Sequence, residues 1–525
     1  MSLLLVLGVS LALPGAAPPP PALRVAVVGA GPAGLTLAHA LLTLPGPQPI
    51  QVPCMQRCPE CNAKDAMRRP RPASPSTVLR AGGSPLSSLI HSKVTVFERY
   101  GELRPSVGGG IQLSSGAAVL EWLGLGEQLA AASVPLRSVK SRKADGTQLL
   151  RLDLGDALTE AGAQLIGGDG AFAIMRDALQ NLLFSPLPPG TVRFNKELVE
   201  AEEMPGASGG PLGFGGEMRL KFADGSEHTA DLLVGADGIG STVKSQCFPS
   251  ETPKYSGIKV VFCVAGKRVR DEADATSFHQ WLGDGAYCLS ASYGALDGGV
   301  TDVLALCYRG DAGERLETVA ENPSWGEGGA LREAVIGRLR NAHFPAEVLE
   351  LAEAAERIYE TPVYFRAPTV SGWSQGEATL VGDSAHAMPP FLGQGANQAI
   401  LDSFCLAAQI KELGSSHPTL KEALREYRKQ RWFPTARLLL NSRILGFLET
   451  QRGFGADFRD FFFLSMGKLG VAQAVFLDGA LPKGVPCGLR GSYNASRPAT
   501  VANPQAQPSA SGSASGSLSN RSWRL

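Results

Sequence analysis

Short apolar runs recur along this chain, and each is followed by a glycine-rich turn or an acidic residue. Val25–Val28, Val94–Phe97, Leu232–Val234 and Thr379–Val381 are nearly continuous apolar runs without the polar alternation of a half-exposed strand. Such runs are typical of parallel strands buried on both faces. Ala33–Leu44, just after the first run, has the length and composition of a helix. The pattern predicts an α/β fold.

A second group of runs predicts a mixed sheet. Val139–Leu154 is predicted to form a hairpin that turns at Asp145-Gly146. The other predicted strands are Thr191–Val199, Met218–Phe222, Ile258–Val264, Tyr287–Ser292, Val303–Tyr308 and Tyr359–Phe365, and the predicted helices are Met175–Phe184, Leu331–Asn341 and Ala346–Ala355. Helices are expected to dominate from residue 413 to about 475.

Three segments lack such periodicity. Residues 45–91 are rich in proline and basic residues and are predicted to be a disordered insertion, and the serine-rich residues 491–525 a disordered tail. Residues 1–23 are a possible targeting segment, because the apolar run in 1–17 resembles a signal-peptide core, although it lacks a basic start. Localisation therefore stays open between cytoplasmic and organellar.

Composition excludes several classes of protein. The 525 residues are too many for one ordinary core, and 49 basic residues balance 49 acidic ones. A neutral chain has no general attraction for nucleic acid. No run reaches the roughly 18 apolar residues of a membrane helix, so no transmembrane helix is predicted. Phe461–Leu464 and Val471–Phe476 are expected to pack against the domain built on the parallel strands, with membrane contact as the alternative.

Cys54, Cys58 and Cys61 have a spacing that is found in some iron–sulfur and zinc sites. They lie in the proline-rich segment, and no fourth ligand is evident except distant His91. We interpret them as loop residues and predict no metal site. The remaining cysteines are scattered, which favours reduced thiols over a disulfide framework.

Residues 29–34 read Gly-Ala-Gly-Pro-Ala-Gly, a dinucleotide-binding fingerprint between a predicted strand and a predicted helix. In such a fingerprint the first glycine permits the tight turn, the second lets backbone N–H groups approach a pyrophosphate, and the third allows close helix–strand packing. These roles fall on Gly29, Gly31 and Gly34. The N-terminus of the helix adds partial positive charge for the phosphates.

Glu98, which ends the run Val94–Phe97, is the predicted acidic partner of this fingerprint and would accept hydrogen bonds from a ribose. The usual gap is about 20 residues. The longer gap here is explained by the insertion 45–91. An exposed acid at the end of a strand is the alternative interpretation.

Two later motifs also follow buried strands. Gly235-Ala236-Asp237-Gly238 comes after Leu232–Val234, and residues 382–402, GDSAHAMPPFLGQGANQAILD, come after Thr379–Val381. Acids at the carboxyl ends of strands lie at the edge where α/β sheets bind ligands. A helix beginning near Gly393–Asn397 would stabilise an anion through its free N–H groups and its dipole. The spacing indicates an extended cofactor lying across the sheet.

With these three motifs the sequence resembles the class A flavoprotein monooxygenases, the FAD-dependent aromatic hydroxylase superfamily that includes salicylate-hydroxylase-like and zeaxanthin-epoxidase-like enzymes. The resemblance covers about Arg24 to Phe433 without the insertion. It implies a Rossmann-like FAD-binding domain, a mixed-sheet substrate domain and a helical C-terminal segment. It places the FAD-binding domain in 24–136, 170–254 and 372–412, the substrate domain in 137–169 and 255–371, and the C-terminal helices in 413–490.

The resemblance also implies roles for individual residues. Glu98 resembles the ligand of the adenosine ribose, Arg176 the arginine beside the flavin, and Asp383 the ribityl ligand. Gly108–Ile111 matches the family's flavin-contacting loop only loosely, and Gly116 stands where many relatives have Asn. The full set of predicted cofactor-binding residues is Gly29, Gly31, Ala33, Gly34, Glu98, Arg99, Gly110, Ile111, Arg176, Asp237, Gly238, Gly382, Asp383, Pro390, Gly393, Gln394, Gly395, Ala396 and Asn397.

The implied activity is that of an FAD-dependent monooxygenase that consumes NADPH or NADH. A flavin C4a-hydroperoxide would transfer one oxygen atom from O2 to an aromatic or unsaturated, isoprenoid-like lipophilic substrate. The flavin carries this chemistry, so no acid–base pair is required and none is assigned. Pro390, Gly393, Gln394 and Gly395 would lie beside the flavin. The alternatives are an FAD-dependent reductase on the same fold and a non-catalytic FAD-binding protein.

Some chemically suggestive residues receive a structural interpretation. His386 has the type of side chain that serves as a general base, but its place in the third motif favours a structural hydrogen bond. His279, Trp281, Tyr287 and Tyr364 lie in the predicted substrate sheet. They are predicted to be core residues, with pocket lining as the alternative.

Overall fold

The computed structural model describes residues 22–44, 92–103, 109–160, 171–205, 216–249, 251–311, 329–370 and 372–482. The predicted insertion 45–91, with its three cysteines, lies outside these residues. So do the possible targeting segment, apart from its last two residues, and the predicted tail 491–525. The predictions for these segments stay predictions.

Within the described residues, the first sheet has six strands, which are ordered β18-β19-β12-β1-β2-β8. All neighbouring pairs are parallel except β18 with β19. Because the strands run the same way, the ends of β1, β2, β12 and β19 reach one edge together. The strands are β1 (Leu23–Val28), β2 (Ser92–Phe97), β8 (Val192–Arg193), β12 (Leu232–Gly235), β18 (Ser374–Gln375) and β19 (Ala378–Leu380).

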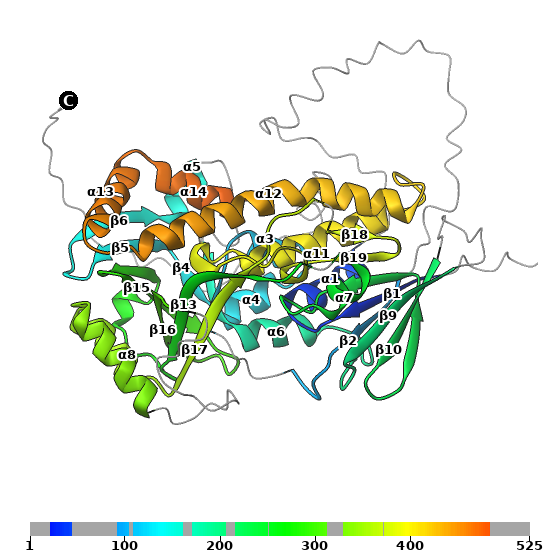
Figure 1. The fold of residues 1–525 in the computed structure, drawn as a ribbon, viewed down its shortest axis with the longest axis horizontal. Helices are drawn as coiled ribbons and strands as arrows, with labels where there is room; N and C mark the ends of the chain where they lie inside the picture. Colours follow the sequence, from blue (N-terminus) through cyan, green and yellow to red (C-terminus); the bar gives the residue numbers. More distant parts are fainter. Residues whose placement is uncertain are drawn as a thin grey trace, which may run out of the picture.

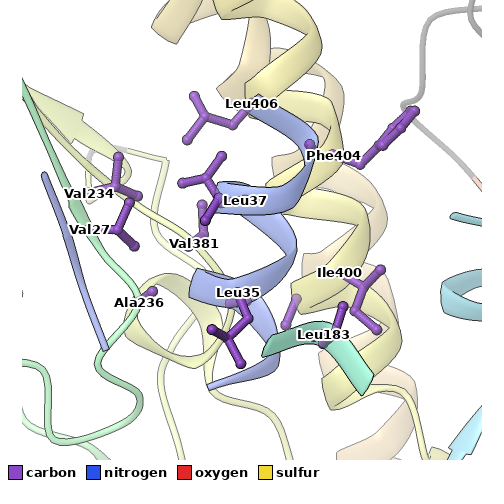
Figure 2. Packing of buried hydrophobic residues seen from close by; sticks show 14 of the residues in the cluster. Val27, Leu35, Leu37, Leu183, Val234, Ala236, Val381, Ile400, Phe404 and Leu406 are labelled. Carbon is purple, nitrogen blue, oxygen red and sulfur yellow. The ribbon is translucent and has the colours of Figure 1, made fainter. Parts of the chain in front are cut away.

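Helices α1 (Pro32–Thr43) and α11 (Gly395–Lys411) form the core beside this sheet. Figure 2 shows Leu37 of α1 on the side of Val27 and Val234, and Ile400 and Phe404 of α11 on the opposite side of α1. Further helices are α3 (Ser115–Trp122), α4 (Gly126–Ala132), α6 (Arg176–Phe184), α7 (Thr242–Cys247) and α10 (Asp383–His386).

The second sheet follows the order β17-β13-β16-β15-β14-β5-β6, and β3, β4 and β7 join it beside β15. It is mixed, since β14 runs parallel to β5 while β13, β15 and β16 pair antiparallel. Its strands are β3 (Gly110–Leu113), β4 (Val134–Leu136), β5 (Ser138–Lys143), β6 (Gln148–Asp153), β7 (Ala171–Met175), β13 (Lys254–Val264), β14 (Ser277–Leu282), β15 (Ala286–Gly294), β16 (Val300–Arg309) and β17 (Arg357–Phe365).

Smaller elements complete both halves of the molecule, with a three-stranded sheet beside the first sheet and helices beside the second. A three-stranded antiparallel sheet is formed by β9 (Leu198–Pro205), β10 (Gly216–Phe222) and β11 (Glu227–Ala230). Helices α8 (Gly329–Asn341) and α9 (Ala346–Glu353) pack against the second sheet at the end away from the first (Figure 1). Helix α5 (Leu154–Glu160) follows β6.

The C-terminal helices are α12 (Leu420–Glu449), α13 (Phe454–Lys468) and α14 (Val471–Ala480). Figure 1 shows α12 extending along both halves of the molecule, with α13 and α14 near β5 and β6. Among the described helices none is by itself long and apolar enough to span a membrane, although α13 and α14, bent by 78°, meet that test as a pair. Phe463 is buried, but against the second sheet and not against the predicted domain. The packing prediction is also wrong for Phe461, Leu464 and Val471, which are 66%, 38% and 42% exposed.

Most elements lie where the pattern predicts them, but one predicted strand is divided. Thr191–Val199 is two short strands, β8 in the first sheet and β9 in the three-stranded sheet. Asn195 between them has φ +55°, a left-handed conformation that ends β8 and redirects the chain. The predicted domain boundaries stay a prediction. The strands β3 and β7, from segments assigned to the FAD-binding part, pair in the second sheet.

A fully buried carboxylate joins the sheet to α11 and α12. Asp402 of α11 accepts hydrogen bonds from the Gly382 N–H at 2.9 Å and from Arg431 Nε of α12 at 2.7 Å, and lies 2.5 Å from His386 Nε2. Burial raises the pKa of Asp402, but His386 and Arg431 more than offset this and hold the pKa below its ordinary value. His386 therefore has the structural role predicted for it. Arg431 also donates to Gln398 Oε1 at 2.6 Å.

Replacing this carboxylate tests its importance. Asp402→Ala is expected to lower the free energy of unfolding by about 3–5 kcal/mol, because Arg431 would be left as an uncompensated buried charge. Urea denaturation of the purified protein measures the change. As a control, Arg219→Ala removes an ion pair with Glu202 at the surface and should leave stability nearly unchanged. Equal stability of Asp402→Ala and wild type would contradict the assigned role.

Candidate active site

Four motif residues meet at the carboxyl edge of the first sheet. Gly29 follows β1, Glu98 follows β2, Asp237 comes just after β12, and Asp383 comes just after β19. The parallel pairing brings these positions together although they span most of the chain. The edge predicted to bind a ligand is therefore assembled from the predicted motifs.

The glycines of the fingerprint have different local environments. Gly29 has φ +105°, and a Cβ there would lie 2.5 Å from the Ala236 carbonyl oxygen. A Cβ on Gly34 would overlap the Gly29 carbonyl, so α1 packs this closely on β1 only with glycine. A Cβ on Gly31 would meet nothing within 4 Å. The backbone at Gly31 thus faces open space where a pyrophosphate can approach.

Glu98 and Gln180 hold the fingerprint loop in place. The Glu98 carboxylate accepts the Ala30 N–H at 2.9 Å and the Tyr100 N–H at 3.2 Å. Gln180 of α6 donates from Nε2 to the Ala30 carbonyl at 2.6 Å. Glu98 therefore shapes the loop as well as facing the cavity beside it, and Gln180 is a supporting residue that the sequence motifs did not reveal.

Two cavities adjoin along this edge. The first, of about 340 Å³, is lined by the predicted residues Gly29, Gly31, Glu98, Arg99, Arg176, Asp237 and Gly238. The second, which we call the central cavity, has about 480 Å³ and is lined by the predicted residues Gly31, Ala33, Gly110, Ile111, Arg176, Gly238, Asp383, Pro390, Gly393, Gly395 and Ala396. Gly31, Arg176 and Gly238 line both, so the two cavities form one elongated site.

The two strand-end acids differ in their environment. One carboxylate oxygen of Asp237 accepts the N–H groups of Thr242 at 2.7 Å and Val243 at 3.2 Å, which caps the start of α7. Burial raises the pKa of Asp237, and its other oxygen has no hydrogen-bond partner among the described residues. Asp383 instead opens into the central cavity at the start of α10. Each therefore has an oxygen available to a ligand.

Three predicted residues do not face the two cavities in the expected way. The Asn397 side chain is fully used by backbone groups: its oxygen accepts the Ser114 and Gly116 N–H groups, both at 2.9 Å, and its nitrogen donates to Gln112 and Gly393 carbonyls. The Asn397 side chain therefore positions loops, and the predicted place of this residue beside the flavin stays a prediction. Gln394 lines a third cavity. Gly382, with φ +61°, is in close contact with Ala399.

Aromatic side chains of the second sheet also line the central cavity, and no motif identified them. A Cβ on Gly110 would overlap the ring of Tyr293, and one on Gly109 would lie 2.5 Å from the ring of Phe262. Tyr293 accepts a hydrogen bond from Gln112 at 2.9 Å, and burial raises its pKa to about 12. Gly109 and Gly110 are therefore explained by rings packed on the backbone.

The other predicted aromatic residues are mostly in the core. His279, Trp281 and Tyr287 are each at most 2% exposed, and Trp281 and Tyr287 belong to apolar clusters. Tyr364 is 37% exposed, so the prediction of a core position is wrong for it. The described residues contain no cluster of three or more His, Cys, Asp or Glu side chains placed to hold a metal ion.

A third cavity, which we call the apolar chamber, has about 220 Å³ and lies between the second sheet and helices α12–α14. It shares Gln112, Leu289, Pro390, Phe391 and Gly393 with the central cavity. Its lining is almost wholly apolar, apart from a few amides and serines and the carboxyl of Glu449 at the end of α12. Burial raises the pKa of Glu449 to about 8, although contacts with Tyr287, Gln280 and Arg459 partly offset it.

Comparison with known proteins identifies the family. Residues 332–433 match a family model described as an FAD binding domain. The 3-amino-4-hydroxybenzoate 2-monooxygenase PtmB3 of Streptomyces platensis is 30% identical over 411 residues, which cover 78% of this chain and 84% of that protein. The chain belongs to the class A flavin monooxygenases.

Other class A flavin monooxygenases are similar to this chain in sequence or in fold. Salicylate hydroxylase of Pseudomonas putida is 27% identical over 281 residues, 51% of this chain and 60% of that protein. A solved salicylate hydroxylase substrate complex superposes with a TM-score of 0.60 at 19% identity, over 91% of this chain and 99% of the other. Klebsiella pneumoniae HpxO with FAD and uric acid gives a TM-score of 0.62 at 18% identity, over 87% and 97%.

This flavin monooxygenase is therefore an FAD-dependent oxidoreductase that uses NADPH or NADH, as predicted, and its mixed α/β fold is confirmed. The residues present fit the cofactor. Open space at Gly31, the unpartnered buried oxygen of Asp237 and the elongated cavity lined by the predicted residues all provide for an extended dinucleotide. Which residue contacts which part of FAD is proposed below.

Two alanine substitutions separate the roles of the fingerprint glycines. Gly34→Ala is expected to destabilise the apoprotein by about 1–3 kcal/mol, because its methyl group overlaps the Gly29 carbonyl. Gly31→Ala meets no protein atom and should leave apoprotein stability unchanged, yet weaken FAD binding on the order of tenfold by occupying the pyrophosphate space. Urea denaturation and fluorescence titration with FAD measure the two effects. Equal FAD affinity of Gly31→Ala and wild type would count against the assignment.

The raised pKa of Glu449 predicts a pH-dependent stability. Between its ordinary value of 4.5 and about 8, the folded protein keeps a proton on Glu449 that the unfolded chain has lost. The free energy of unfolding therefore falls as pH rises through this window, by up to about 1.4 kcal/mol per pH unit from this group. Glu449→Gln should remove that part of the slope in urea denaturation from pH 5 to 8. Parallel curves for wild type and variant would refute a raised pKa.

Proposed function

We propose that this monooxygenase inserts one oxygen atom from O2 into an aromatic or unsaturated lipophilic substrate where the central cavity meets the apolar chamber. The observation that supports this most directly is the shared wall of Pro390, Phe391 and Gly393. This wall belongs to the third motif, at the start of α11, and it separates the site suited to a flavin ring from a chamber suited to an apolar molecule.

In this proposal the residues of the elongated site hold FAD along its length. Gly31 and the first turn of α1 take the pyrophosphate, Glu98 the adenosine ribose, Arg176 the middle of the site and Asp383 the ribityl chain. The first turn of α11 contains no acidic residue, and its N-cap Gln394 makes no side-chain capping bond, so its N–H groups are available to an anionic ring edge. FAD, once reduced by NAD(P)H, supplies the activation of O2.

The protein groups around the central cavity favour positioning over acid–base catalysis. Burial raises the pKa of Tyr293 to about 12 and raises that of Cys307 well above its ordinary value, so both stay protonated near neutral pH. His386 is committed to Asp402. Phe262, Leu289 and Met388 exclude water from the same space. These residues orient a substrate and keep the site dry, which is the protein's share of flavin chemistry.

The relatives support an aromatic substrate. Two of them are named for 3-amino-4-hydroxybenzoate and salicylate, both small hydroxylated rings. The apolar chamber gives this chain room for a more lipophilic molecule than those acids. An unsaturated isoprenoid-like substrate is the other class that fits, because relatives at 28% and 33% identity are zeaxanthin epoxidases.

Isotope labelling tests this function. Protein loaded with FAD and given NAD(P)H is screened with aromatic and isoprenoid compounds for those that accelerate flavin reduction, and turnover is then run under ¹⁸O2. We expect the product to carry one ¹⁸O atom, and flavin reoxidation without substrate to release hydrogen peroxide. Product oxygen derived from water, or reduced enzyme that does not react with O2, would favour a reductase.

A substitution at the start of α11 tests the position of the flavin ring. A Cβ on Gly395 would meet nothing within 4 Å, and this residue lines the central cavity. Gly395→Val should fold normally but lower kcat on the order of 100-fold, because its side chain would hold the flavin edge away from the N–H groups of α11, and losing contact with one preorganised donor costs about 3 kcal/mol. Gly337→Val on α8, where the Cβ also meets nothing, is the matched control and should retain activity. Full activity of Gly395→Val would place the ring elsewhere.

A further inference from the structure

The apolar chamber is large enough for a ring-containing ligand. Its volume of about 220 Å³ exceeds the roughly 150 Å³ of an engineered apolar cavity that binds benzene. One side is formed by β5, β6 and β14 and the other by α12, α13 and α14, with apolar contributions from Val139, Leu150, Leu152, Phe278, Leu438 and Leu445. Pro390 and Phe391 line both this chamber and the central cavity, so the two spaces adjoin there.

One acidic side chain faces this apolar chamber. Glu449, the last residue of α12, is 0% exposed and lines the chamber. Gln280 Nε2 donates a hydrogen bond to Glu449 Oε1, and Ser141 Oγ donates to Gln280 Oε1 at 2.6 Å. In this Ser141–Gln280 relay each donor and acceptor is fixed, and Glu449 Oε1 is the final acceptor. Glu449 Oε2 has no hydrogen bond of normal geometry among the described residues, and its neighbour, the buried Tyr287 hydroxyl, has none either.

The fold does not satisfy Glu449 as it satisfies the buried acids Asp302 and Asp402. Asp302 accepts hydrogen bonds from the Val269 and Arg270 N–H groups and from Ser292. Asp402 is matched by Arg431 and His386. Arg459, the cation that acts on the pKa of Glu449, is committed elsewhere. Its Nη1 donates to the carbonyls of Gly283 and Glu449, and its guanidinium pairs with Asp460. A buried carboxyl oxygen without a partner is destabilising. A ligand that supplies the missing partner would remove this cost.

We propose that Glu449 is a substrate-recognition residue whose free oxygen donates a hydrogen bond to a carbonyl or hydroxyl oxygen at the remote end of a lipophilic, ring-containing substrate. This inference rests on the proposed function, since the other end of that substrate would extend past Phe391 into the central cavity. The Ser141–Gln280 relay holds the carboxyl in place.

The class of ligand group follows from the hydrogen-bond directions. Because Oε1 accepts from Gln280, a proton on the neutral carboxyl sits on Oε2, where it is a donor. The raised pKa of Glu449 keeps the group neutral at pH 7. An oxygen acceptor therefore matches it, whereas a hydrocarbon leaves the donor unpaired. Sites built to hydrogen-bond a substrate discriminate strongly against analogues that lack the group.

Binding of matched probes to the FAD-loaded full chain tests the inference without turnover. The probes are 2-acetylnaphthalene, with a carbonyl oxygen, and 2-isopropenylnaphthalene, of the same shape without it, measured by equilibrium dialysis at pH 7. Relative to wild type, Glu449→Leu should lower the ketone-to-hydrocarbon affinity ratio about tenfold, which corresponds to about 1.4 kcal/mol. Glu449→Gln keeps an N–H donor and should lower the ratio less than threefold.

A chamber-filling variant provides the matched control. Val475→Trp, on α14, should weaken both probes alike and leave their ratio unchanged, since it removes space but not the donor. An unchanged ratio in Glu449→Leu, or full binding of both probes to Val475→Trp, would overturn the proposal. If 2-(aminomethyl)naphthalene binds more tightly than the ketone and Glu449→Gln abolishes that preference, the oxygen class is overturned in favour of a cation.

The same preparations separate this inference from the proposed function. Circular dichroism and FAD content establish that each variant folds, and if Glu449→Leu does not, Glu449→Gln and Val475→Trp still decide the outcome. A wild type that shows the predicted probe ratio but incorporates no oxygen from O2 would support the recognition role and overturn the monooxygenase proposal. If wild type incorporates oxygen from O2 but Glu449→Leu keeps the wild-type ketone-to-hydrocarbon ratio, the monooxygenase proposal is supported and the recognition role is overturned.

Discussion

The buried carboxylate of Asp402 is the interaction on which the arrangement of the site depends. It fixes the turn after β19 through Gly382, the short helix α10 through His386, and α12 through Arg431, while itself belonging to α11. The first turn of α11 faces the central cavity, and the last residue of α12 is Glu449 in the apolar chamber. The buried charge of Asp402 is tolerated because Arg431 and His386 are held in place to compensate it. Asp402 therefore links the helices that line the central cavity and the apolar chamber.

Close backbone approach is the second constraint, and it explains why glycine occurs where it does. At Gly29, Gly34 and Gly110 a side chain would strike a carbonyl group or an aromatic ring, so these residues allow elements to pack. At Gly31 and Gly395 a side chain would meet only open space. The first group serves the fold, and the second leaves room for a cofactor. Glycine in these motifs therefore has two roles, close packing of the backbone and space for a ligand.

The three adjoining cavities differ in polarity, and each lining suits a different part of the cofactor or substrate. The first cavity presents Glu98, Arg99, Arg176 and Asp237 to a charged nucleotide. The central cavity combines Arg176 and Asp383 with rings from the second sheet, and the chamber beyond is apolar except for a few amides and hydroxyls and one acid. Burial raises the pKa of Tyr293 in the central cavity and of Glu449 in the chamber, which favours their neutral forms. Substrate orientation there depends on shape and on a few directed hydrogen bonds.

The sequence alone determined the parallel sheet and its ligand-binding edge, and its resemblance to the flavin monooxygenases identified the cofactor. Buried strands, tight glycine turns and strand-end acids are encoded locally, so Gly31, Glu98 and Asp383 could be named as candidate cofactor ligands without coordinates. Only the tertiary structure showed that the Asn397 side chain hydrogen-bonds to loop backbone groups and that Tyr293 and Phe262 line the central cavity. The same holds for the hydrogen bond by which Gln280 orients Glu449. These depend on contacts between segments far apart in the chain, and no local pattern records which distant residue will be the neighbour.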